Sequence, residues 1–228
     1  MTEPGRAESA AALAQCPRLA AGDRFDFACA GCGDCCRQRR DLVLSGYDLY
    51  RIARRLSLPP RIVAAAFCKS YLAPESCLPA LRLTPDPKTG NCRFFEGSAC
   101  TIHAARPLAC ALYPLGQAID PATAAMEYYV QLPLCGARVS AQEQRTLQNY
   151  LDDAAITARA GIDARWAVVC TQLSDKLQQA GGRENPRYLP AARRIARALY
   201  FDYSIQDDFY PQFNANTQAL WPLLDKML

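Results

Sequence analysis

Histidine is nearly absent from this chain of 228 residues, which has a single His beside twelve cysteines. A Cys–His nucleophile pair therefore depends on His103 alone, and nothing in the sequence positions that residue. Apolar runs are short, and none approaches the ~20 residues that a membrane-spanning helix needs. Basic residues exceed acidic ones only slightly, 26 against 22, whereas nucleic-acid-binding domains carry clustered basic residues in larger surplus. We therefore expect neither a membrane span nor a nucleic-acid partner.

Several enzyme signatures are missing as well. The sequence has no C-x-x-x-C-x-x-C radical-SAM loop, no G-x-G-x-x-G dinucleotide fingerprint and no G-x-S-x-G elbow. No catalytic residue is therefore assigned. The first residues have acids near the start and no apolar segment of the kind that export signals contain. We accordingly expect a cytoplasmic protein, in a reducing compartment where cysteines are more often metal ligands than disulfide partners.

Cysteine density predicts three consecutive regions. We expect a flexible N-terminal tail over 1–24, a cysteine-cluster metal-binding domain over 25–137, and a helical C-terminal region over 138–228. The predicted fold class is mostly α with a small β-hairpin, held together by metal and continued by C-terminal helices. Ser45 with Asp48, and Ser140 with Glu143, are spaced to cap two of these helices. Apolar spacing predicts helices around 45–56, 60–71, 140–158, 166–177, 192–199 and 220–227, and strands at 81–83, 115–119 and 128–132.

The clearest chemical signal is the run Cys29-Ala-Gly-Cys32-Gly-Asp-Cys35-Cys36. A C-x-x-C pair turns tightly enough to place two sulfurs on one metal, and glycines let the backbone bend around it. The repeated step resembles a ferredoxin run more than a zinc finger. Further ligands must come from elsewhere, and the candidates are Cys92, Cys100, Cys110 and Cys135.

With these residues the sequence resembles the YkgJ-type cysteine-cluster family, also called the CxxCxxCC zinc- or iron-chelating domain. The resemblance covers about residues 25–137, and a related branch is the flagellin lysine N-methylases. Departures are small: the family often has Tyr at His103, Arg at Ala111 and Pro at Gly136. The matching residues are Cys29, Cys32, Cys35, Cys36, Cys92, Cys100, Arg106-Pro107, Cys110, Tyr113-Pro114 and Cys135.

The resemblance implies metal chelation and leaves the metal open. The repeated C-x-x-C step and the scarcity of histidine favour an iron–sulfur cluster, and two closed Cys₄ zinc sites are the alternative. The leading function is a redox or accessory component. The alternatives are a protein-modifying enzyme of the lysine N-methylase type and a structural zinc module that binds an unidentified protein partner.

Neighbouring cysteines are expected to differ in role. Side chains of adjacent residues diverge in most backbone conformations, so Cys35 is predicted to join Cys29 and Cys32. Cys36 is predicted to face a second centre or to be a spare thiol paired with the later group Cys92, Cys100, Cys110 and Cys135. Cys170 lies within a helical stripe of apolar residues and Cys68 lies beside one, so both are expected to pack in the core. Cys77 is a minor ligand candidate, and His103 is a polar neighbour more than a ligand. Arg106 has two equal interpretations, a structural turn or a positive charge beside the thiolates.

Overall fold

The computed structural model describes residues 15–25, 27, 33–37, 42–131 and 145–228. These residues form two compact units, each assembled from separate stretches of chain. Unit 1 draws on 1–39, 85–103 and 108–164, and unit 2 on 40–84, 104–107 and 165–228. The structure thus divides the chain differently from the consecutive regions expected from cysteine density. That density marks where thiols occur along the chain and does not report which apolar stripes pack together.

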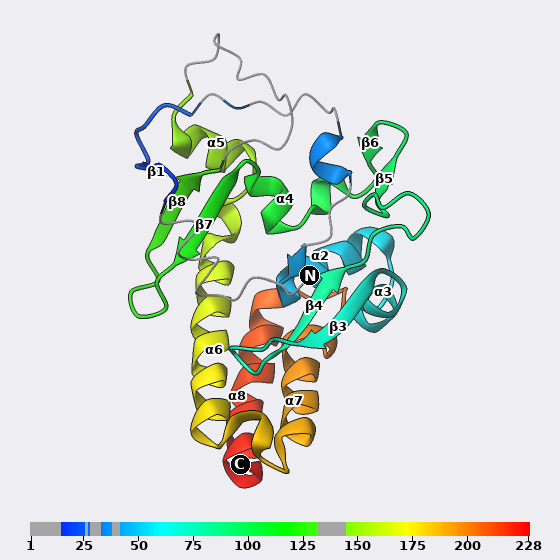
Figure 1. Ribbon diagram of the computed structural model, residues 1–228, viewed down its shortest axis with the longest axis vertical. Coiled ribbons are helices and arrows are strands. Elements are labelled where there is room, and N and C mark those ends of the chain that lie inside the picture. The colour runs from blue at the N-terminus through cyan, green and yellow to red at the C-terminus, as the bar shows by residue number, and fades with distance from the viewer. Residues whose placement is uncertain (1–14, 26, 28–32, 38–41, 132–144) are drawn as a thin grey trace. The chain divides into compact units, whose positions relative to one another are not determined.

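Unit 1 is built around a small antiparallel sheet in which β8 lies between β1 and β7 (Figure 1). The predicted hairpin is confirmed, with Leu115 paired to Val130 and Ile119 to Met126. Asp120 closes its turn by accepting a hydrogen bond from the amide of Ala122 at 2.8 Å. The elements are β1 (Arg18–Leu19), η1 (Asp34–Cys36), β5 (Phe95–Glu96), β6 (Ala99–Cys100), α4 (Leu108–Leu112), β7 (Leu115–Ile119), β8 (Met126–Val130), α5 (Leu147–Asp153) and η3 (Thr157–Arg159).

The core of unit 1 joins the residues just before the first cysteines to α4, β7 and α5. Phe25 and Phe27 pack against Tyr150 with their rings edge-on. α5 begins after Thr146, whose side chain and that of Asn149 form a reciprocal capping box. The buried residues of this core are Phe25, Phe27, Ala111, Leu112, Leu115, Leu147, Tyr150, Leu151 and Ile156.

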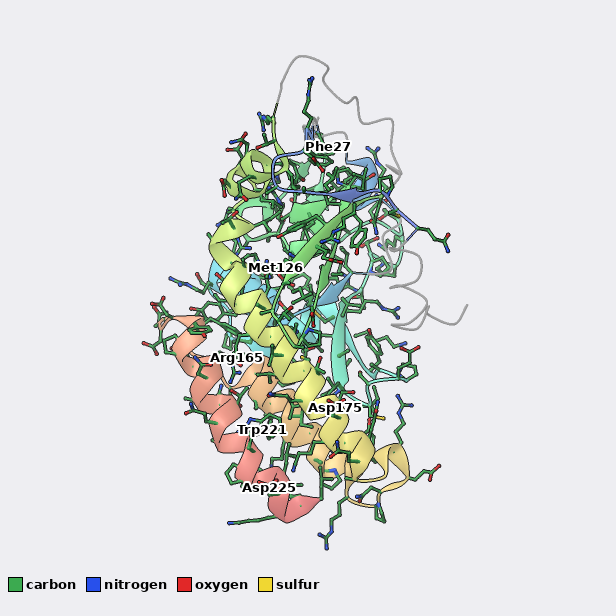
Figure 2. All side chains as sticks on the ribbon, turned by 90° about the vertical axis from the view of Figure 1, so that its left-hand side faces the viewer. Phe27, Met126, Arg165, Asp175, Trp221 and Asp225 are labelled. Atoms are coloured by element: carbon green, nitrogen blue, oxygen red, sulfur yellow. The ribbon has the colours of Figure 1, made fainter. Side chains whose placement is uncertain are left out.

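Unit 2 packs helices against a second small sheet, in the order β2-β4-β3. η2 (His103–Ala105) and α6 (Ala160–Gln179) cross the boundaries between the stretches of chain assigned to the two units. Figure 2 shows Asp175 on α6 and Trp221 and Asp225 on α8. The remaining elements of unit 2 are β2 (Val43–Leu44), α2 (Gly46–Leu56), α3 (Pro60–Phe67), β3 (Cys68–Leu72), β4 (Pro79–Leu83), η4 (Gly182–Glu184), α7 (Tyr188–Ala196), η5 (Arg197–Phe201) and α8 (Phe209–Met227).

The start of α2 shows how sequence fixes local structure in unit 2. Ser45 accepts a hydrogen bond from the amide of Asp48, whose carboxylate accepts one from the Ser45 amide, so the predicted cap is confirmed. The first residue of α2, Gly46, must be a glycine, because a Cβ at this position would lie 2.0 Å from the Leu199 carbonyl oxygen. α2 therefore approaches η5 more closely than any larger residue at position 46 permits.

Several helix predictions need correction. α3 ends at Phe67, and Tyr71 lies in β3, where it pairs with Ala80. Residues 68–72 form a strand and not a helix, because their backbone hydrogen-bonding groups are paired with those of β4. The last helix, predicted around 220–227, begins at Phe209, so Pro222 lies inside α8 and not near its start. The predicted Ser140–Glu143 cap lies outside the described residues.

Helices dominate as predicted, and the described residues form several small antiparallel sheets where we expected one hairpin. That a metal holds the fold together stays a prediction. None of the helices in the described part of the chain has the length and apolarity that crossing a bilayer requires.

Candidate metal centre

Cys35 and Cys36 lie on the single 3₁₀ turn η1, near the start of unit 1. The amides of Cys36 and Arg37 both donate to the Gly33 carbonyl, at 2.9 and 3.1 Å. The two sulfurs are 3.9 Å apart. Our expectation that neighbouring cysteines diverge is therefore wrong here. A 3₁₀ turn rotates consecutive residues by about 120°, so adjacent side chains do not point to opposite sides as they do in a strand.

The thiol of Cys36 is affected by other predicted ligands. The pKa of Cys36 is raised far above its usual range, first by its hydrogen bond with Cys35 and next by burial. Charge on Cys35, Cys110 and Cys100 raises that pKa further, because thiolates close together repel one another. Three other predicted ligands thus act electrostatically on Cys36.

Cys92 joins the same region through its backbone. Its amide donates to the Cys36 carbonyl at 2.8 Å, and its own carbonyl accepts from the Phe95 amide at 3.0 Å. Phe95 in turn pairs with Cys100 across the β5–β6 hairpin. Backbone hydrogen bonds therefore tie the Cys35–Cys36 turn to the segment that carries Cys92 and Cys100.

The ring of Phe95 packs directly on Gly33. A Cβ at Gly33 would lie 2.2 Å from Cζ of that ring, and the residue has a φ of +74°. Both facts require glycine at this position. The guanidinium of Arg37 lies over the same ring, 5.4 Å from its centroid, at cation–π distance. Sequence reasoning missed Phe95, although the glycines between the cysteines signalled a close backbone approach.

The donor set fits a metal that prefers thiolates. Four thiolates at ~2.3 Å from a tetrahedral zinc are about 3.8 Å from one another, close to the separation of the Cys35 and Cys36 sulfurs. As the side chains stand, no three ligating groups within the described stretches converge tightly enough to enclose an ion. Three predicted ligands, Cys29, Cys32 and Cys135, lie outside the described residues.

The other singled-out residues lie in different settings. Cys68 starts β3 and Cys170 is on α6, and both are partly buried. Cys77 is buried in unit 2, where the Tyr188 hydroxyl donates to its carbonyl at 2.7 Å. His103 is exposed. The predicted role of each as ligand or non-ligand stays a prediction.

The segment around Arg106 is held by an arginine that sequence reasoning missed. Within unit 2, Arg51 of α2 donates to the carbonyls of Ala104 and Arg106, at 2.6 and 3.3 Å. These carbonyls lie on the chain between Cys100 and Cys110. Arg51 thus satisfies carbonyls of the segment between η2 and α4. Nothing in the local sequence signalled it, because α2 is about fifty residues away.

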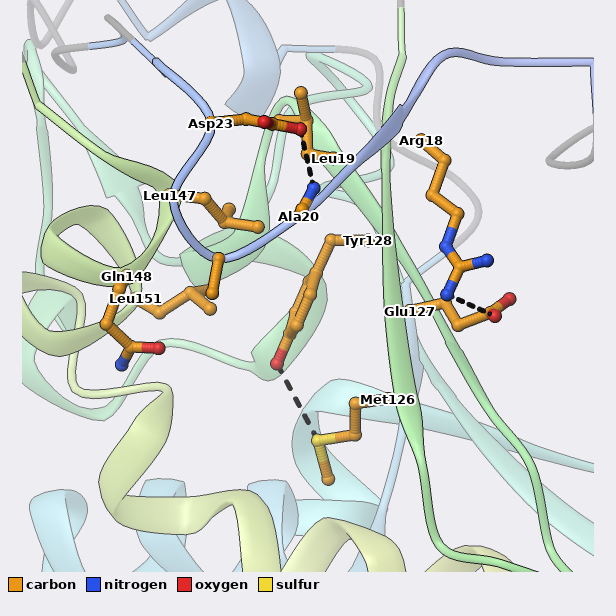
Figure 3. Close-up of a pocket in the computed structure, with 11 residues that line it drawn as sticks. Arg18, Leu19, Ala20, Asp23, Met126, Glu127, Tyr128, Leu147, Gln148 and Leu151 are labelled. Carbon is orange, nitrogen blue, oxygen red and sulfur yellow. Dashed lines mark hydrogen bonds and ion pairs between the residues drawn. The ribbon is translucent and has the colours of Figure 1, made fainter.

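Unit 1 also contains an open cavity of about 460 Å³ beside β1, β8 and α5. Figure 3 shows the Tyr128 ring along this cavity, with its hydroxyl linked to the Met126 sulfur, and the Arg18–Glu127 ion pair beside it. Burial raises the pKa of Tyr128, and Gln117 donates to its hydroxyl at 3.2 Å. Among the described residues that line this cavity there is no cysteine.

Residues 28–136 match the model of a protein family, CxxCxxCC, whose description is "Putative zinc- or iron-chelating domain". The resemblance inferred from the cysteine pattern is therefore confirmed over these residues, which are similar to the CxxCxxCC family. That description supports metal binding and leaves the kind of metal open. No curated protein and no solved structure is significantly similar to the chain.

Proposed function

We propose that this domain binds an iron–sulfur cluster through its cysteines and acts as a redox or accessory component in the cytoplasm. The observation that carries the proposal is the pair of sulfurs of Cys35 and Cys36, 3.9 Å apart on a turn that backbone hydrogen bonds tie to the segment carrying Cys92 and Cys100. Thiols brought this close repel one another when ionised, and a bound cation removes that repulsion.

Two features of the sequence favour iron–sulfur over zinc. The C-x-x-C-x-x-C step is the spacing of ferredoxin-type runs, and the chain offers a single imidazole. A bound cluster would supply electron transfer. The residues of this chain would hold it with thiolates and, through Arg37, keep a positive charge beside them.

We further assign Cys35 and Cys36 to the same centre, since their sulfurs are 3.9 Å apart. Cys35→Ser and Cys36→Ser should therefore lose metal to the same extent. Cys16→Ser is the matched control, because Cys16 is not among the predicted ligands and should leave the metal content unchanged. Full metal retention in Cys36→Ser alone would show that the two sulfurs serve different centres.

Metal analysis after anaerobic purification tests the proposal itself. We expect iron with acid-labile sulfide and a brown colour that bleaches in air. Stoichiometric zinc without sulfide would overturn the iron–sulfur assignment and favour the structural zinc module. Absence of any metal from the anaerobically handled wild type would overturn metal binding through these cysteines.

The lysine N-methylase alternative is tested by ligand binding. An enzyme of that type must bind S-adenosylmethionine, and the sequence carries no recognisable site for it. We expect no binding by calorimetry to the metal-loaded protein. Saturable micromolar binding would make the enzyme the leading function.

A further inference from the structure

We propose that Tyr150 is a positioning residue for the metal centre, although it lies beyond the residues that match the family. The inference rests on the proposed function, in which Cys110 is a metal ligand. Tyr150 belongs to α5 in unit 1 and is 8% exposed. Its side chain contacts two separate stretches of chain: one carries Cys110, and the other leads to the first cysteines.

The hydroxyl of Tyr150 lies at the C-terminal end of α4, the helix that contains Cys110. It is 2.8 Å from the Tyr113 carbonyl oxygen and 3.0 Å from that of Ala111. The last carbonyls of a helix have no partner within the helix, and here a buried hydroxyl donates to them. α4 has only five residues, too few to be stable without tertiary contacts. The position of Cys110 therefore depends on this hydrogen bond.

The ring of Tyr150 contacts the stretch of chain that leads to the first cysteines. It packs edge-on against Phe25, with centroids 4.9 Å apart, and against Phe27 at 6.3 Å. These two residues precede the cysteine run by a few positions. Edge-to-face pairs of this kind add to the stability gained from burial alone. One side chain thus contacts α4 with its hydroxyl and the approach to the cysteine run with its ring.

Tyr150→Phe separates the two contacts, because it keeps the ring and removes the hydroxyl. We expect the purified protein to release its bound metal to a chelator about tenfold faster, which corresponds to about 1.4 kcal/mol. In the metal-free protein, amide hydrogen exchange over residues 108–113 should accelerate by a similar factor, since the end of α4 opens more often.

Tyr203→Phe is the matched control. Tyr203 is equally buried, and its hydroxyl donates to the Ala198 carbonyl at 2.6 Å, but it lies in unit 2. It should lower overall stability similarly and leave both metal release and exchange over 108–113 at wild-type rates.

Equal metal release from Tyr150→Phe and wild type would overturn the inference. So would equal acceleration in both tyrosine variants, because that would indicate general destabilisation. Faster release without faster exchange over 108–113 would also overturn it, since the effect would not pass through α4. A wild-type protein that holds no metal refutes the proposed function instead, and the exchange measurement still tests the contact with α4.

Discussion

Gly33→Ala should disrupt the turn that carries Cys35 and Cys36. An alanine at the φ of +74° found here pays about 1–2 kcal/mol for the left-handed backbone. Its Cβ would also lie 2.2 Å from Cζ and 2.4 Å from Cε2 of Phe95, so the ring must move. Overpacking of this kind costs about 1–3 kcal/mol. The total destabilisation should therefore be about 2–5 kcal/mol.

Gly90→Ala is a close control for the backbone cost. Gly90 has the same φ of +74°, but no atom lies within 4 Å of the Cβ that an alanine would add. The two variants share the strain of the left-handed region and differ in the clash with Phe95. In urea unfolding followed by circular dichroism, Gly33→Ala should unfold about 0.3–1 M earlier than Gly90→Ala. Its metal content should fall as well, because Gly33 accepts the hydrogen bonds that shape the cysteine turn.

A second substitution tests the stated cause. Phe95→Leu shortens the side chain that meets the new Cβ. Combined with Gly33→Ala, it should cost less than the two single changes added together, since the residues are in contact. Equal midpoints for Gly33→Ala and Gly90→Ala, or strict additivity with Phe95→Leu, would refute the packing argument.

Three further predictions concern the rest of the chain. Metal removal by a chelator should accelerate hydrogen exchange over 85–103 while α7 and α8 stay protected, and uniform acceleration would contradict this. Ser45→Ala removes the cap of α2 and should cost about 1 kcal/mol in urea unfolding, whereas no change would show that the cap is dispensable. Burial raises the pKa of Cys68 from 9.0 to about 12. The unfolded thiol therefore ionises first, so stability should fall as pH rises from 9 to 12, and Cys68→Ala should reduce that fall. An unchanged pH profile in this variant would contradict the assignment to Cys68.

Local features of the structure could be predicted from the sequence. The α2 cap follows from the spacing of Ser45 and Asp48, and the β7–β8 hairpin from alternating residues around Asp120. Each depends on residues close together in the chain, whose geometry is set by backbone sterics and nearby hydrogen bonds. The cysteine run likewise identified the family, because its spacing is a local property.

Long-range arrangement could not be predicted in the same way. The spacing of Cys35 and Cys36 does not reveal that a 3₁₀ turn brings their sulfurs together. No pattern linked Phe95 to Gly33 or Tyr150 to α4, because these contacts join residues far apart in sequence. The strand at Tyr71 was missed for the same reason, since pairing with β4 overrides its helical spacing.

Because each unit is assembled from separate stretches of chain, cutting out one continuous stretch divides both units. A fragment cut to residues 28–136 would lack Leu147, Tyr150 and Leu151, which complete the core of unit 1. It would also carry α2 and α3 without the C-terminal helices grouped with them in unit 2. We therefore expect that the stretch matching the family does not fold by itself in this protein. Transplanted alone into another chain, it would expose apolar surface and tend to aggregate.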